Sequence, residues 1–416
     1  MRNRFLALSP GTRYAWFLFV YFWIYGFICS VNRFVQSYYQ NDISHYLSTG
    51  RSFLGTTWSV NIIIGALCSP VGGYLADQYG YRRVMMASSL LTSASVGTLL
   101  LFPSTTGYFI GFGLLAGLVG IAASANYVFV ADWFASHRAK VLVLLNSSGS
   151  LGLAILSPVF IMNEDRLGWR PLYGFSVAAG VIFCALTFLV VRPNPNRLPE
   201  PSAVPSAPRP RPSLRSAADL ARKLRDGRII AVMAALFTCG FSMGTVEMHL
   251  MAIYQVAGAD RMVFSSSLTL LGVLELSGGI VFSFLLDRMR RELALASLYA
   301  VRVVAFLILF LHFPASPLLF SLIFGASYLG ALPGGILLAN EALEQQGIST
   351  GLITGFLILI HQAGGALSGV AGGLNYDWFH NYQLLIAFNI GLSMVSAAGY
   401  AAVYRRTLNK TEERAA

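Results

Sequence analysis

The chain of 416 residues consists of long apolar runs that are separated by short polar segments. A helix that crosses a membrane needs about 20 mostly apolar residues, and twelve runs of about this length follow one another along the chain. They cover approximately residues 14–38, 53–75, 84–102, 108–131, 139–162, 171–191, 229–255, 262–286, 293–313, 316–340, 350–374 and 382–404. The pattern predicts an all-α membrane protein with twelve transmembrane helices.

One long polar segment, residues 192–228, separates the first six runs from the last six. Its first part is rich in proline, which is typical of an extended, semi-rigid linker. Its second part, residues 213–228, places leucines at helical spacing between basic residues. Two interpretations of that part stay open: a helix on the anionic inner leaflet, or a tether whose arginines enforce topology. The predicted organisation is an N-terminal six-helix bundle over 1–191, a cytoplasmic linker over 192–228, a C-terminal six-helix bundle over 229–404 and a cytoplasmic tail over 405–416.

Charged residues make up only 11% of the chain, and hydrophobic residues make up 56%. A soluble globular domain carries about 25% charged residues. The composition therefore excludes an ordinary cytosolic enzyme, a disordered scaffold and a disulfide-rich secreted domain. The four cysteines lack the spacing of a metal site, and we interpret them as buried apolar residues: Cys29, Cys68, Cys184 and Cys239.

The formal net charge of +11 raises the question of nucleic-acid binding. With the N-terminus in the cytoplasm, 23 of the 29 lysines and arginines fall in cytoplasmic segments and 4 fall in outward loops. This asymmetry follows the positive-inside rule, so the excess charge sets the topology and requires no nucleic acid. We predict a monomeric, multi-pass protein of the bacterial inner membrane, with both termini in the cytoplasm and the lipid bilayer around it.

A polar loop motif follows the second run and returns in shortened form after the eighth. The first copy, Gly73 to Arg83, reads Gly-Tyr-Leu-Ala-Asp-Gln-Tyr-Gly-Tyr-Arg-Arg, and the second, Leu285 to Arg291, reads Leu-Leu-Asp-Arg-Met-Arg-Arg. The same element at matching positions of two halves indicates an internal repeat. The first copy resembles the signature loop of the major facilitator superfamily, whereas the second copy lacks both glycines of that loop.

This resemblance covers nearly the whole chain and implies two pseudo-symmetric six-helix bundles. The bundles would enclose a midplane site and expose it alternately to each side of the membrane. The resemblance also implies a cytoplasmic gate formed by the charged residues of the two loops, namely Asp77, Arg82, Arg83, Asp287, Arg290 and Arg291. The alternative is that these charges only satisfy the positive-inside rule.

Several shorter segments resemble the organic-anion branches of the superfamily, including organophosphate antiporters, anion:cation symporters and monocarboxylate transporters. They are Asp132-Trp133-Phe134, Gly149-x-x-Gly152, Gly168-Trp169-Arg170 and His361-Gln362-Ala363-Gly364-Gly365. The resemblance implies a small organic anion as the substrate. The run 108–131 contains no charged residue, so it lacks the arginine that proton-coupled drug transporters commonly carry there.

Few ionisable residues lie within the runs, and each is a functional candidate because an uncompensated charge in hydrocarbon costs several kcal/mol. Arg33 resembles the substrate-binding arginine in the first helix of organophosphate and anion:cation symporters. Its planar guanidinium would pair with a carboxylate through two hydrogen bonds. The alternative is an arginine that extends to the outer interface, with Asp42 as its partner.

Glu247 and His249 lie at almost the same depth in the second half as Arg33 does in the first. We predict that one of them carries a coupled proton, since histidine titrates near neutral pH and a glutamate beside a cavity can exchange its proton. The alternative is that Glu247 pairs with Arg33 as an outer gate. Glu275 is a further proton-coupling candidate. Glu275 and Arg302 lie at similar depth on sequential antiparallel helices, which predicts a structural ion pair.

The remaining candidates are polar residues that would line the cavity. We predict His361, His249, Gln36 and Tyr127 as substrate-binding residues together with Arg33; the alternative for His361 is a hydrogen bond between helices. Tyr25, Asn61, Asn126, Tyr254 and Tyr328 are also plausible, although most such residues only join neighbouring helices.

The sequence contains no Gly-rich phosphate loop, metal-ligand cluster or nucleophile–base set, so we expect neither an enzyme nor a cofactor. The predicted function is secondary active transport of a small organic anion, a carboxylate, by proton-coupled symport. The alternative is a proton-driven exporter of a drug or an amphiphilic metabolite such as a siderophore. A transporter-like sensor that signals to a membrane partner is a third hypothesis.

Overall fold

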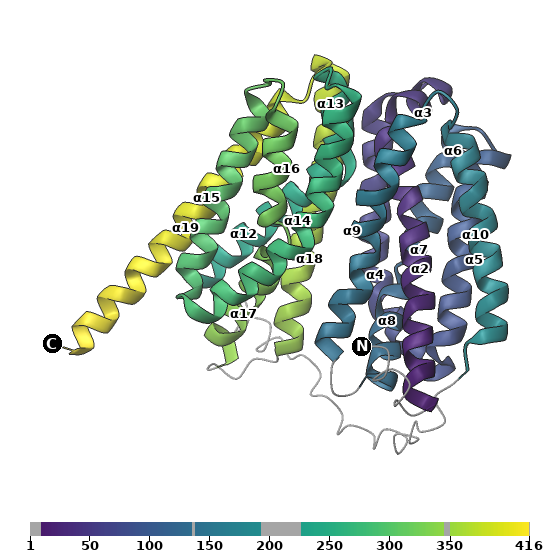
Figure 1. The fold of residues 1–416 in the computed structure, drawn as a ribbon. Helices are drawn as coiled ribbons and strands as arrows, with labels where there is room; N and C mark the ends of the chain where they lie inside the picture. Colours follow the sequence, from purple (N-terminus) through teal and green to yellow (C-terminus); the bar gives the residue numbers. More distant parts are fainter. Residues whose placement is uncertain (1–9, 135–137, 193–225, 345–349, 416) are drawn as a thin grey trace. The chain divides into compact units, whose positions relative to one another are not determined.

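The computed structural model describes residues 10–134, 138–192, 226–344 and 350–415. Within these ranges all regular secondary structure is helical, and twelve helices are long and apolar enough to cross a membrane. Both findings confirm the predicted fold class (Figure 1). Most of the predicted linker lies outside the described residues, so both interpretations of its basic stretch, 213–228, stay predictions.

Contacts divide the chain into two compact units, Met1–Glu200 and Pro201–Ala416. The helices of the first unit are α2 (Pro10–Tyr38), α3 (Gln40–Tyr46), α4 (Arg51–Tyr79), α5 (Tyr81–Leu101), α6 (Thr105–Tyr108), η1 (Phe109–Leu115), α7 (Ala116–Leu118), α8 (Ile121–Trp133), α9 (Arg138–Met162) and α10 (Trp169–Val190). The helices of the second unit are α12 (Gly227–Gly244), η2 (Thr245–His249), α13 (Leu250–Val256), α14 (Arg261–Arg288), α15 (Arg291–Phe310), α16 (Ser316–Ala326), α17 (Ala331–Glu344), α18 (Thr350–Phe379) and α19 (Gln383–Ala415). Helix α19 thus continues through most of the predicted tail.

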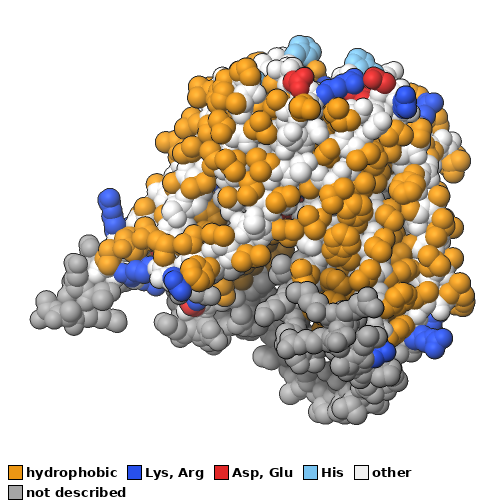
Figure 2. Space-filling model, in the orientation of Figure 1, with side chains coloured by type: hydrophobic (Ala, Val, Ile, Leu, Met, Phe, Trp, Pro, Cys, Tyr) orange, Lys and Arg blue, Asp and Glu red, His pale blue; other side chains and the backbone are white. Residues whose placement is uncertain are grey.

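Hydrophobic side chains cover the outer sides of the helices. On the face shown in Figure 2 they cover the stretch between the helix ends, whereas Lys, Arg, Asp and Glu side chains gather at the ends. Large exposed side chains include Leu67 and Ile182 in the first unit and Ile280 and Val395 in the second. Since contiguous apolar surface of this extent is unfavourable in water, the arrangement suits the hydrocarbon interior of a bilayer.

Aromatic side chains fill the core of the N-terminal unit. Phe22 of α2 packs edge-to-face on Phe129 of α8, with the ring centroids 4.9 Å apart, and Tyr21 stacks on Phe183 of α10 at 4.6 Å. The Tyr21 hydroxyl donates to the Phe183 carbonyl oxygen at 2.9 Å, so the polar end of this ring is satisfied inside the core. These contacts join α2, α8 and α10.

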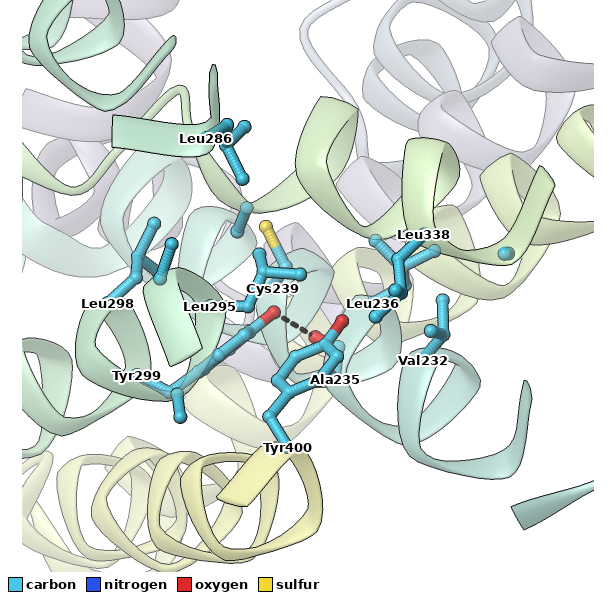
Figure 3. Packing of buried hydrophobic residues seen from close by; sticks show 14 of the residues in the cluster. Val232, Ala235, Leu236, Cys239, Leu286, Leu295, Leu298, Tyr299, Leu338 and Tyr400 are labelled. Atoms are coloured by element: carbon cyan, nitrogen blue, oxygen red, sulfur yellow. Dashed lines mark hydrogen bonds between the residues drawn. The ribbon is translucent and has the colours of Figure 1, made fainter. Parts of the chain in front are cut away.

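The core of the C-terminal unit lies where α12, α15 and α19 meet (Figure 3). Tyr299 of α15 donates its hydroxyl to the carbonyl oxygen of Ala235 in α12, and its ring stacks with Tyr400 of α19. Leu236 and Cys239 of α12 complete this part of the core, and none of the five side chains is more than 1% exposed. The core therefore holds α15 and α19 against one side of α12.

Glycines bring α12 and α18 into direct backbone contact. A Cβ atom at Gly240 would overlap the carbonyl oxygen of His361, and a Cβ atom at Gly364 would overlap that of Phe237. Small residues at helix crossings permit such an approach in membranes. The contact fixes the position of His361 along α12.

Two helices of the C-terminal unit that the sequence predicted as continuous are interrupted. The seventh run contains a π-helical turn, Thr245–His249, between α12 and α13. The tenth run breaks between Ala326 and Ala331, which separates α16 from α17. Pro333 explains the second break, because proline has no N–H and its ring crowds the carbonyl four residues earlier.

The close contact of α12 and α18 yields a stability prediction. Gly240→Ala should lower the Tm of the purified protein, since overpacking of a well-filled contact costs about 1–3 kcal/mol. Gly391→Ala in α19 is the matched control, because a Cβ atom there meets no heavy atom within 4 Å. A Gly240→Ala protein that melts at or above the Tm of the wild type and of Gly391→Ala would contradict this packing.

Candidate functional site

Five polar side chains of the C-terminal unit gather within the membrane-spanning helices, and we call them the buried polar cluster. They come from five different segments: Cys239 of α12, Glu247 of η2, Arg302 of α15, Tyr328 of the α16–α17 turn and His361 of α18. Glu247 is half-buried, and the other four are less than 9% exposed. Because these groups belong to helices long and apolar enough to cross a membrane, or to the turn between two of them, an uncompensated charge among them is costly, and the partners of each group determine what it can do.

Glu247 is the acidic member of the cluster. It lies on the π-helical turn, a type of helix distortion that often occurs at functional sites. The Tyr328 hydroxyl donates to Glu247 Oε1 at 3.0 Å, and His361 lies within electrostatic range of the same carboxylate. A half-buried carboxylate thus lies beside a hydroxyl donor and an imidazole.

Arg302 is the cationic member of the cluster, and its side chain is completely buried. Its Nη2 atom donates to the carbonyl oxygens of Ser327 at 3.0 Å and Tyr328 at 3.1 Å. The guanidinium also lies 5.5 Å from the ring centroid of Tyr299 and 5.2 Å from that of Phe324. Carbonyl dipoles and aromatic faces both stabilise a cation where water is absent.

These contacts correct the predicted ion pair between Glu275 and Arg302. Among the described residues, the hydrogen bonds of Arg302 go to two carbonyl oxygens and none goes to a carboxylate. The physical reason is the break between α16 and α17, which leaves carbonyl oxygens in need of a donor. Glu275 is half-buried in α14.

His361 and Cys239 join the cluster at the contact of α18 with α12. His361 Nδ1 lies 3.2 Å from Gln362 Oε1, and the Cys239 thiol interacts with both His361 and Arg302. The Cys239 Sγ atom also lies 3.7 Å from Met243 Sδ. Cys239 is buried as predicted, whereas the other three cysteines are only half-buried. Sequence reasoning missed the polar neighbours of Cys239 because this residue lies in an apolar run.

His249 has different surroundings from Glu247. Its side chain is fully buried, its Nε2 atom lies 3.1 Å from the carbonyl oxygen of Gly369, and its ring lies 5.5 Å from that of Tyr382. A Cβ atom at Gly372 would overlap the imidazole. The structure therefore packs His249 against α18, whereas Glu247 is hydrogen-bonded to Tyr328.

The N-terminal unit holds three of the predicted substrate-binding residues. Arg33 of α2 is exposed, Gln36 is half-buried and interacts with the Tyr108 hydroxyl, and Tyr127 of α8 is 58% exposed. Asp42, the alternative partner predicted for Arg33, is exposed in α3. Partial burial and the nearby Glu164 carboxylate raise the pKa of Asp42 above its usual range.

The predicted gate residues lie near the helix ends, and the structure pairs several of them within their own unit. Arg82 donates to the Phe188 carbonyl oxygen and stacks on the Phe188 ring, whereas Asp77 and Arg83 are exposed. Arg290 lies over the Tyr404 ring at 5.1 Å, and Arg291 forms an ion pair with Glu341. Sequence reasoning missed Glu341 because no motif marks it, and the Asp287 side chain lies outside the described residues.

Within the described ranges, no group of three or more His, Cys, Asp or Glu side chains is arranged to hold a metal ion. The fold and the polar side chains inside it point to passage of a solute through the membrane. The family model of the Major Facilitator Superfamily matches residues 22–360. The chain belongs to the major facilitator superfamily. It is an integral membrane protein and a secondary transporter.

Relatives and solved structures agree with this assignment. The chain is 26% identical to the MFS-type transporter YcxA of Bacillus subtilis, over 93% of this chain and 95% of that protein. It is 27% identical to a D-galactonate transporter of Escherichia coli over 45% of this chain and 44% of that protein. The fold is similar to that of the nucleoside transporter NupG, with a TM-score of 0.70 and 11% identity over 95% of this chain and 99% of that chain. It is also similar to that of the xylose transporter XylE of E. coli, with a TM-score of 0.68 and 14% identity over 92% of this chain and 95% of that chain.

The packing of His249 yields a prediction that separates structure from transport. His249→Asn should lower the Tm, because the loss of a buried hydrogen bond costs about 1–3 kcal/mol. Gly372→Ala, which crowds the same ring, should lower it as well. Neither change should alter the response of uptake to an imposed pH gradient. A His249→Asn variant with normal Tm but no response to the gradient would show instead that His249 exchanges the proton.

Proposed function

We propose that this transporter moves a small organic anion, a carboxylate, in symport with protons by alternating access. In this proposal Glu247 carries the proton and Arg33 binds the anion. The observation that supports it best is the environment of Glu247, a half-buried carboxylate on a π-helical turn with Tyr328 and His361 beside it. Protonation of Glu247 would remove a charge from hydrocarbon, and this gives the proton a direct influence on which conformation is stable.

The relatives support both parts of the proposal, the anionic substrate and the coupled proton. A D-galactonate transporter, whose name specifies a sugar-acid anion, is 27% identical over 195 residues. A D-xylose-proton symporter, whose name specifies a coupled proton, shares the fold with a TM-score of 0.65. Arg33 would supply the planar, permanently charged donor that a carboxylate favours.

A second candidate function is export of a drug or an amphiphilic metabolite. Multidrug resistance proteins MdtG of Salmonella are 30% identical to this chain over 153 residues, and α2 is rich in aromatic side chains. The direction of flux separates the two candidates. Uptake into proteoliposomes should be measured for monocarboxylates, D-galactonate, dicarboxylates and phosphorylated acids, with and without an inward pH gradient; gradient-driven efflux of amphiphilic dyes without acid uptake would favour export.

The proton role of Glu247 yields a prediction for transport. In Glu247→Gln, an inward pH gradient should no longer accelerate uptake, whereas exchange of labelled for unlabelled substrate should continue, because exchange needs no net proton movement. Glu275→Gln is the matched comparison, since it neutralises another half-buried glutamate of the same unit. Full gradient dependence in Glu247→Gln, or its loss in Glu275→Gln alone, would assign the proton elsewhere.

The anion role of Arg33 yields a prediction for affinity. Arg33→Gln should raise the KM for the transported acid about ten- to hundredfold, since hydrogen bonds to charged groups contribute about 1.5–3 kcal/mol. The KM of Arg33→Lys should lie between those of Arg33→Gln and the wild type, because lysine keeps the charge but lacks the planar guanidinium. Arg166→Gln, which removes an exposed loop charge, is the control and should leave the KM unchanged. Equal KM values in all four proteins would rule out Arg33 as the anion-binding residue.

A further inference from the structure

Two of the polar contacts of Tyr328 lie at opposite ends of the residue. Its hydroxyl donates to Glu247 Oε1 at 3.0 Å, and its carbonyl oxygen accepts from Arg302 Nη2 at 3.1 Å. The residue lies in the turn between α16 and α17, outside both helices. Its N–H donates to the carbonyl oxygen of Gly325 at 3.1 Å, whereas its carbonyl oxygen accepts from the Arg302 side chain.

Backbone hydrogen bonds to Phe324 and Gly325 hold the N–H groups of this turn, and Arg302 holds its carbonyl groups. One nitrogen of its guanidinium bonds the carbonyl oxygens of both Ser327 and Tyr328. The rings of Tyr299 and Phe324 lie against the same guanidinium. A planar group held by rings on α15 and α16 can keep two successive carbonyls in one orientation, which a flexible ammonium cannot do equally well.

We propose that Arg302 is a positioning residue, which holds the α16–α17 turn so that the Tyr328 hydroxyl stays bonded to Glu247. This inference rests on the proposed proton role of Glu247. Arg302 is 0% exposed, so it acts through Tyr328 and does not contact the transported solute. The turn thus determines the hydrogen bonding of the carboxylate that exchanges the proton.

The alternative is that Arg302 only stabilises the packing of α15 against the α16–α17 turn. A purely structural role predicts a lower Tm for an Arg302 variant and no change in the surroundings of Glu247 in the protein that remains folded. A positioning role predicts that the same variant changes the hydrogen bonding of the Glu247 carboxyl group. The two roles therefore differ in a spectroscopic signal that requires no knowledge of the substrate.

The test is infrared difference spectroscopy of the full-length protein in lipid, titrated with acid alone. The carboxyl band of Glu247 is the C=O band that disappears in Glu247→Gln. In Tyr328→Phe this band should move to higher frequency, because the hydrogen bond from the hydroxyl is lost. Arg302→Gln should shift the band by a similar amount, and Arg302→Lys should shift it less. The double variant Arg302→Gln/Tyr328→Phe should shift the band no further than Tyr328→Phe alone.

Tyr299→Phe is the matched control, since it removes the hydrogen bond to Ala235 but keeps the ring beside Arg302. It should lower the Tm and leave the band in place. If Arg302→Gln does not fold, Arg302→Lys replaces it and should shift the band in the same direction. A folded Arg302 variant with an unshifted band would overturn the positioning role. Failure of the proposed function would be a separate result: the wild type would show no pH-driven uptake, independently of the position of the carboxyl band in any variant.

Discussion

An ion in the hydrocarbon interior of a membrane is stable only when nearby groups replace its lost hydration, and the inner structure of the C-terminal unit depends on this constraint. Arg302, completely buried in α15, meets it in part: Nη2 bonds two carbonyl oxygens and two aromatic rings lie near the guanidinium, whereas Nε and Nη1 have no hydrogen-bond partner among the described residues. These carbonyls are accessible because α16 and α17 are separated by a turn. The cation and the helix break therefore stabilise one another, since each supplies the partner that the other lacks.

The same constraint applies to Glu247, but a carboxylate can meet it in a second way. Arginine side chains are permanent cations in proteins, whereas a carboxylate can remove its charge by taking up a proton. Glu247 is half-buried and accepts a hydrogen bond from the Tyr328 hydroxyl. We propose that the permanent charge of Arg302 holds the structure of the turn, whereas the carboxylate of Glu247 couples transport to the proton.

Long, simple features of the sequence predicted the fold. The twelve spans depend on the length of the apolar runs, and the family depends on a loop motif that needs no knowledge of side-chain contacts. The seventh and tenth runs were nevertheless predicted as continuous helices. Hydropathy averages over some 20 residues, so it does not detect a π-helical turn at Thr245–His249 or a four-residue break before Ala331.

The side-chain partners were less predictable, for two physical reasons. The sequence predicts a Glu275–Arg302 pair because the two residues lie at similar depth, but depth does not specify which way a side chain points around its helix. Backbone carbonyls freed by a break leave no mark in the sequence. Glu247 and His249 are close in the sequence, but residues two positions apart on a helix do not face each other. Helical periodicity therefore could have separated them, whereas the contacts of Arg302 and Cys239 required the structure.

We propose that a carboxylic acid and protons enter together through a mechanism that depends on Glu247. The most direct measurement follows a pH indicator outside proteoliposomes while an acid that the protein takes up is added without any imposed gradient. The wild type should make the external medium more alkaline as the anion enters, and Glu247→Gln should not. Anion uptake by the wild type without any change in external pH would contradict proton-coupled symport.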